Sequence, residues 1–291
     1  MKLAISVASA VMVILSVVAL FSPWLASGPY TDIHAVLGDA HLPPLSQASS
    51  GARIHWMGTD ALGRDMLSRL LAGLRQSLWI GFAAVMIAAL LGAGLGLLAG
   101  YRGGIADQAI MRFGELSVTI PPLLSAMVLF AAGKAWWGGL AGDGTRASWL
   151  IIMAIVLVDW VAYARAARAL VMIEKRKTYV EAAVAIGTGD LRIAFRHILP
   201  HASRPLVTLA TLSVPSAIIT EATLSFLGIG LPAGAPSLGT MIAEGQTDLF
   251  AGIWWTLAFP SGVLVALTLS ISAIGYALQR GGDRRPEGRT F

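Results

Sequence analysis

The stretch at residues 181–200, EAAVAIGTGDLRIAFRHILP, is polar and lies between two long apolar segments of a 291-residue chain. Its first part, up to Ile186, predicts a helix, and Gly187 permits the positive φ at which such a helix can end. Asp190 suits the start of a second short helix, because the positive end of the helix dipole stabilises a carboxylate. Leu199-Pro200 follows, and we expect this proline to end the second helix. The stretch therefore predicts a compact helix–glycine–helix hairpin, shaped to fit the groove of a partner.

The composition indicates a membrane protein. Hydrophobic residues make up 56% of the chain and charged residues 13%, with a mean hydropathy of +0.72. Soluble domains average about a quarter charged residues. The chain has no cysteine, which excludes disulfides, thiolate zinc sites and a cysteine nucleophile. The net charge of +5 resides beside apolar segments, where basic residues indicate membrane topology rather than nucleic-acid binding.

Six apolar segments predict an all-α polytopic protein with six transmembrane helices, because about 18 apolar residues suffice to span a bilayer. A signal peptide is the alternative for the first segment, but its apolar run exceeds the usual 7–15 residues or so, which favours a retained helix. The predicted organisation is an N-terminal transmembrane helix at 1–22, a periplasmic segment at 23–77, a core of five transmembrane helices at 78–279 and a cytoplasmic tail at 280–291. The predicted spans are residues 3–20, 78–99, 116–133, 147–164, 205–231 and 249–279.

The periplasmic segment ends in a predicted interfacial amphipathic helix before the second span. Asp60 is expected to cap its N-terminus. Arg64, Arg69 and Arg75 fall outside its apolar face, which is formed by Met66, Leu67, Leu70, Leu71, Leu74 and Leu78.

Glycines and prolines mark two further features of the spans. Gly92, Gly96 and Gly100 recur every four residues, a spacing that lets two helices approach closely. Residues 101–115 are expected to be a polar connection. Pro121 and Pro122 interrupt the third span, and such breaks are tolerated where neighbouring helices satisfy the freed backbone groups. Lining of a pathway and simple packing both remain open for this break.

Two acidic residues fall within predicted spans, where an ionised side chain costs at least about 2.5–3.5 kcal/mol. Asp159 lies near the inner end of the fourth span, where we expect Arg165 or Arg168 to pair with it in a structural role. Glu221 is expected to lie deeper in the fifth span, either as a pathway or gate residue or as a buried, hydrogen-bonded acid.

Basic residues predict the orientation. With the N-terminus inside, fifteen of the 21 Lys and Arg residues lie on the inner side and six on the outer side. Residues 164–204 carry eight of the fifteen. The positive-inside rule therefore predicts that both termini and the 181–200 stretch are cytoplasmic.

The pattern Glu-Ala-Ala, then Gly, then Leu-Pro resembles the cytoplasmic EAA loop of permease subunits in binding-protein-dependent ABC importers. In that family the loop is the coupling helix that docks onto the ATPase, which implies a coupling role for Glu181, Ala182, Ala183, Gly187, Asp190, Leu199 and Pro200. The position two before Leu-Pro holds His197 where the family's pattern has an apolar residue. Residues 55–78 and 221–242 also resemble the dipeptide, oligopeptide and nickel permeases.

The resemblance implies a type I ABC importer permease fold in the bacterial inner membrane. It also implies a heterodimer with a paralogous permease, two cytoplasmic ATPases, and a periplasmic or lipid-anchored substrate-binding protein. Peptides are the expected substrate, with nickel or another metal chelate as the alternative.

The chain has no Walker phosphate-binding loop and no hydrolase motif, so we expect a non-catalytic subunit without a cofactor or metal of its own. ATP and Mg²⁺ would bind the partner ATPases. An ATP-independent secondary transporter is the alternative from another class, but matching broken helices in two inverted halves are not evident.

Overall fold

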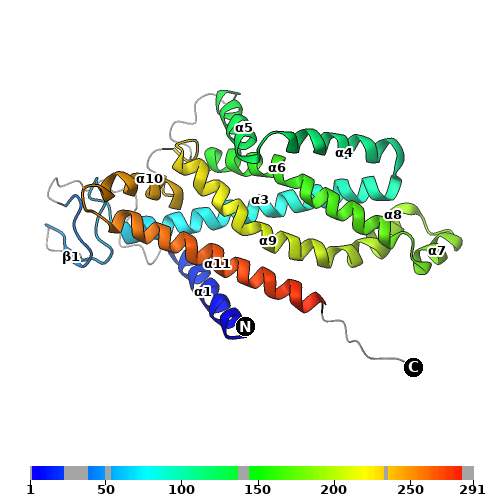
Figure 1. Ribbon diagram of the computed structural model, residues 1–291, viewed down its shortest axis with the longest axis horizontal. Helices are drawn as coiled ribbons and strands as arrows, with labels where there is room; N and C mark the ends of the chain where they lie inside the picture. The colour runs from blue at the N-terminus through cyan, green and yellow to red at the C-terminus, as the bar shows by residue number, and fades with distance from the viewer. Residues whose placement is uncertain (1, 23–38, 50–53, 137–143, 233–234, 284–291) are drawn as a thin grey trace.

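The computed structural model describes residues 2–22, 39–49, 54–136, 144–232 and 235–283. In it the chain is an elongated bundle of helices (Figure 1). Helices α7 and α8 lie at one end of the bundle, and β1 and α10 lie at the other. The elements are α1 Lys2–Leu20, β1 Ser46–Gln47, β2 Ile54–His55, α3 Met66–Arg102, α4 Gly104–Thr119, α5 Pro122–Trp136, α6 Gly144–Glu174, α7 Thr178–Ala185, α8 Asp190–Arg192, the π-helix η1 Ile193–Ile198, α9 Leu199–Phe226, α10 Leu238–Leu249 and α11 Trp255–Asp283.

The prediction of an all-α membrane protein is confirmed. Four stretches of helix are long and apolar enough to cross a membrane: Met66–Arg102, Gly144–Glu174, Ile193–Phe226 and Trp255–Arg280. Helices α4 and α5 form a fifth candidate if they count as one span, bent by 95°. Helix α1 contains a shorter apolar stretch and packs against α11 and α3.

Helices α3 and α6 pack closely along their lengths at the centre of the bundle, and the predicted glycine stripe makes this possible. A Cβ at Gly92 would lie 2.3 Å from the Trp160 carbonyl oxygen, and one at Gly96 would lie 2.3 Å from that of Ala164. The packing role predicted for the stripe is confirmed, because α6 backbone occupies the space that side chains on α3 would need.

Gly96→Ala is expected to destabilise the fold by about 1–3 kcal/mol, because the new methyl group can be accommodated only if the two helices separate. Gly94→Ala is the matched control, since a Cβ at Gly94 meets no atom within 4 Å. The apparent Tm of each purified variant in detergent measures the difference. Equal Tm values for the two variants would contradict the role of the stripe.

The start of α3 differs from the prediction. Its N-cap is Asp65, whose carboxylate accepts a hydrogen bond from the Ser68 backbone N–H at 2.8 Å, so the expected cap at Asp60 is wrong. The amphipathic helix is not separate, because α3 runs without a break from Met66 into the second span. Its apolar face packs inside the protein, with Met66, Leu70, Leu71, Leu74 and Leu78 buried and Leu67 partly buried. Arg69 is buried as well, at 3% exposed, because two carboxylates pair with it.

The boundaries of later elements differ too. The break at Pro121 is confirmed, but residues 101–115 belong mainly to α4 rather than to a polar connection. The fifth span ends at Phe226 rather than residue 231, and the last helix begins at Trp255 rather than residue 249, after a turn at Gly252 with φ +82°. Helix α11 also continues to Asp283, so the first residues of the predicted tail are helical. Residues 284–291 and the loop between α5 and α6, residues 137–143, lie outside the described residues.

Candidate functional site

The end of helix α7 has the geometry predicted from its sequence. Gly187 adopts φ +78°, which an amino acid with a Cβ rarely adopts. The Thr188 N–H donates to the Ala183 carbonyl at 3.0 Å, and the Gly187 N–H donates to the Val184 carbonyl at 2.9 Å. This is a Schellman motif, which satisfies the last carbonyls of the helix and reverses the chain.

The second arm of the hairpin begins at Asp190, as predicted, but Pro200 does not end it. The chain continues through η1 directly into α9, and Pro200 is the second residue of α9. A proline removes one helical N–H and crowds the preceding turn, which normally breaks a helix. The π-helical turn at Ile193–Ile198 lies in that preceding turn and widens the backbone there. We call α7, α8 and η1 with their connection, residues 178–198, the 178–198 hairpin.

An apolar cluster joins the hairpin to the ends of α3 and α6. Ala183 is 6% exposed and packs in this cluster, whose other buried members are Leu97, Val171, Val180, Ile193, Ala194 and Ile198. Of the predicted coupling residues, Ala183 therefore faces the protein itself rather than a partner. Burial of these side chains packs the hairpin directly against the helix bundle.

Three large apolar side chains of the hairpin are exposed to solvent. Ile186 is 82% exposed, Val184 58% and Phe195 59%. Glu181 and Ala182, near Val184 and Ile186 in the sequence, are exposed as well. Large exposed apolar side chains on a protruding element are typical of protein–protein contacts. The predicted docking residues Glu181, Ala182 and Gly187 thus lie on the surface that a partner can reach.

Polar contacts at the base of the hairpin were not predicted. The Tyr101 hydroxyl donates to the Asp190 carboxylate at 2.8 Å, and Lys175 Nζ donates to the Tyr101 carbonyl at 2.6 Å. The Tyr179 hydroxyl donates to the Glu174 carboxylate at 2.7 Å. Burial, and then this hydrogen bond, raise the pKa of Tyr179 to about 12, so the phenol remains a donor at neutral pH. These partners are up to 89 positions apart, a separation that sequence spacing does not reveal.

Glu221 is fully buried, at 0% exposed, within a network of three serine hydroxyls. Its carboxylate accepts hydrogen bonds from Ser77 on α3 at 2.8 Å, from Ser225 on α9 at 2.9 Å, and from Ser237, the N-cap of α10, at 2.8 Å. Glu221 lies near the end of α9 that meets α10, not deep in the span as expected. Of the two roles that the sequence allowed for Glu221, this geometry matches the buried, hydrogen-bonded acid.

Asp159 lies halfway along α6 and is partly exposed. The expected partner Arg168 instead pairs with Asp107 on α4, through two hydrogen bonds of 2.5 and 2.7 Å. Arg168 can reach α4 because α6 is longer than predicted. The helix continues ten residues beyond the predicted end of the span at residue 164. Among the described residues, no ion pair of Asp159 is present, and Pro121 is exposed at the break between α4 and α5.

Comparisons with known proteins agree with this architecture. A family model described as the binding-protein-dependent transport system inner membrane component matches residues 92–287. The di/tripeptide transport system permease protein DppC of Pseudomonas aeruginosa is 38% identical over 268 residues, covering 92% of this chain and 84% of that protein. The oligopeptide transport system permease protein OppC of Bacillus subtilis is 33% identical over 269 residues, covering 92% and 81%.

A solved structure shares the fold. It is an inward-facing conformation of the MetNI methionine ABC transporter, with a TM-score of 0.55 and 21% identity, and the match covers 75% of this chain and 95% of the matched chain. The sequence relatives and the family model extend over most of this chain. The chain therefore belongs to the family of binding-protein-dependent transport system inner membrane components, the non-catalytic permease subunits of ABC importers.

Proposed function

We propose that this chain forms half of the translocation pathway of an importer for di- or oligopeptides. The support is the identity of 33–38% to permeases named for di/tripeptides and oligopeptides, over 92% of the chain. Nickel or another metal chelate is the alternative substrate. The further subunits are a paralogous permease, two cytoplasmic ATPases that bind ATP and Mg²⁺, and a periplasmic or lipid-anchored binding protein.

The 178–198 hairpin is, in this proposal, the coupling element that docks onto an ATPase. The exposed apolar surface of Val184, Ile186 and Phe195 is the observation that carries it, because such a surface is unfavourable in water without a partner. The buried cluster beneath it would then transmit movement of the ATPase to α3 and α6 as a rigid contact. Counting α1 and the bent α4–α5 pair as spans gives six transmembrane helices in a type I permease fold, with both termini and the hairpin cytoplasmic.

Transport then follows from alternating access between two states that ligands shift. Closure of the ATPase dimer on ATP moves the paired hairpins together and opens the helix bundles toward the binding protein, and hydrolysis resets them. Asp159 and the break at Pro121 and Pro122 are the proposed pathway residues of this chain, since a partly exposed carboxylate in a span requires water, protein or substrate beside it.

Affinity purification of the tagged chain from membranes tests the proposal. Recovery of a second permease and of ATPases with Walker motifs is expected, together with uptake of peptides in proteoliposomes that requires ATP and the binding protein. Uptake of nickel but not peptides would support the alternative substrate. A chain that purifies alone and transports in response to membrane potential would instead indicate a secondary transporter.

A further inference from the structure

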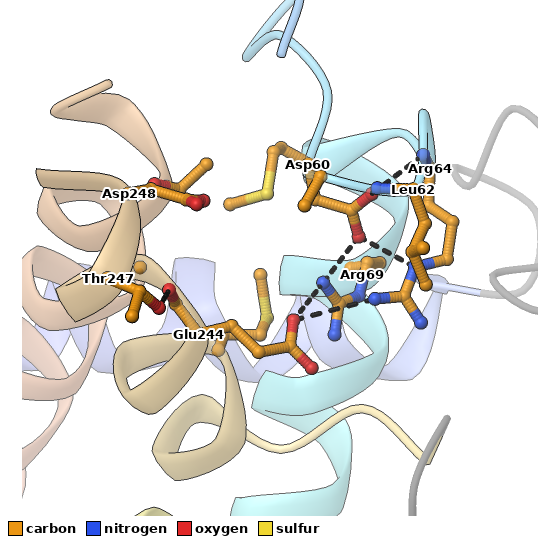
Figure 2. A pocket seen from close by; sticks show the side chains of 12 residues that line it. Asp60, Leu62, Arg64, Arg69, Glu244, Thr247 and Asp248 are labelled. Atoms are coloured by element: carbon orange, nitrogen blue, oxygen red, sulfur yellow. Dashed lines mark hydrogen bonds and ion pairs between the residues drawn. The ribbon is translucent and has the colours of Figure 1, made fainter. Parts of the chain in front are cut away.

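A pocket of about 290 Å³ lies between the loop that precedes α3 and helix α10, at the end of the bundle opposite the 178–198 hairpin (Figures 1 and 2). This volume lies at the lower limit of the roughly 300–1,000 Å³ typical of small-molecule sites, so the pocket can hold a long side chain or a small ligand. Its polar lining consists of Asp60, Arg64, Arg69, Glu244, Thr247, Asp248 and Thr256.

One wall of the pocket is fixed by ion pairs. Asp60 Oδ2 accepts hydrogen bonds from Arg64 Nε and Arg69 Nη1, both at 2.6 Å, and Arg69 also donates to Glu244 Oε2 at 2.7 Å (Figure 2). The side chains of Asp60, Arg64 and Arg69 are at most 9% exposed. Both guanidinium groups are therefore committed to carboxylates within the wall, which holds the pocket in one shape.

The other wall carries a carboxylate that lacks a comparable partner. The side chain of Asp248 is 14% exposed, and among the described residues the basic side chain beside it is His41, with Nδ1 3.9 Å from Oδ2. That distance is too long for a hydrogen bond, and no hydrogen bond to this carboxylate is present in the described part of the chain. The carboxylate of Asp248 therefore has acceptor capacity left for a cationic donor that enters the pocket.

The summed charge of the lining residues also favours a cation. Three carboxylates, those of Asp60, Glu244 and Asp248, face two guanidinium groups, which leaves a net charge of −1. Glu244 is the member of the ion-pair wall that remains open to solvent, at 47% exposed. A cation in the pocket would therefore lie beside both Glu244 and Asp248, which are four residues apart on α10 and share one face of that helix.

We propose that this pocket receives a lysine or arginine side chain of the binding protein, whose cationic group pairs with Asp248 and Glu244. The inference rests on the proposed function, which places this end of the bundle outside the cytoplasm. Its lining comes from the loop before α3 and from α10 and the adjoining ends of α3 and α11, at the end of the bundle that would face the binding protein in that proposal. Complementary charge at such a contact sets both specificity and association rate.

The test measures the affinity of the binding protein for the full importer in nanodiscs. Asp248→Asn is expected to weaken binding about tenfold or more and to reduce its dependence on salt, because one charge pair is lost. Asp248→Glu retains the charge and should bind with nearly unchanged affinity. Glu115→Gln removes one negative charge far from the pocket and controls for net charge. Equal affinity and equal salt dependence for Asp248→Asn and the wild type would overturn the proposal.

A second measurement does not depend on affinity. Because the chain contains no cysteine, Asp248→Cys introduces a single thiol, and cysteine-free partner subunits keep it the only one. Docking of the binding protein should slow the reaction of this thiol with a cationic thiol reagent. Protection by free peptide without the binding protein would identify the substrate as occupant and overturn the proposal. Failure of the wild-type importer to bind any binding protein would instead reject the proposed function.

Discussion

Gly187→Val is expected to abolish coupled uptake, while the chain still inserts and assembles. Gly187 has φ +78°, and a β-branched residue is strained there by about 1–3 kcal/mol. No atom lies within 4 Å of an added Cβ, so the effect arises from the backbone and not from a clash within the chain. Relief of the strain would open the Schellman motif and turn α7 away from the docking geometry. Peptide uptake and ATPase activity stimulated by the binding protein, in proteoliposomes, measure the loss, which should exceed about tenfold.

Two variants separate backbone strain from surface changes. Gly187→Asn should retain most activity, because asparagine tolerates positive φ better than other residues with a Cβ. Gly189→Ala should also be active, since Gly189 has φ −65° and space for a methyl group. Normal stimulated ATPase activity in Gly187→Val would argue strongly against the hairpin as the coupling element.

The hairpin shows which features the sequence can predict. Its turn at Gly187 and the start of its second arm at Asp190 depend on local backbone chemistry, and both are confirmed. Whether the helix ends at Pro200 depends on the π-helical turn before it. That turn is stabilised by burial of Ile193 and Ile198 against distant helices. Propensity alone therefore predicts a helix end where tertiary packing keeps the helix continuous.

The ion pairs in the pocket wall also depend on contacts between distant parts of the chain, which the sequence does not predict. Asp60, Arg64 and Arg69 form a sequence-local set, yet the partner that completes it, Glu244, lies 175 positions after Arg69. The sequence placed these arginines outside the apolar face of the predicted helix, where a charged residue without a partner would face water. Their burial becomes favourable only because α10 places the Glu244 carboxylate beside them, and no periodicity in the sequence predicts that contact.

Glu221→Ala is expected to destabilise the fold by about 3 kcal/mol or more, because it leaves three buried serine hydroxyls without their acceptor. These hydroxyls join α3, α9 and the N-cap of α10, so the α10 end of the bundle should loosen first. The apparent Tm and the rate of proteolysis near Ser237 measure the effect. Ser77→Ala, which removes a single hydrogen bond, is the matched control and should cost about 1 kcal/mol.

Glu221→Gln distinguishes the structural role from a role in the pathway. An amide retains the size of the carboxylate but offers one acceptor oxygen in place of two, so a structural Glu221 predicts a lower Tm with uptake reduced in proportion to the amount of folded protein. Uptake lost at an unchanged Tm would instead place Glu221 in the pathway. The structural outcome is the expected one, because all three hydroxyl donors come from this chain itself and the carboxylate is 0% exposed, which leaves no face of it for a substrate.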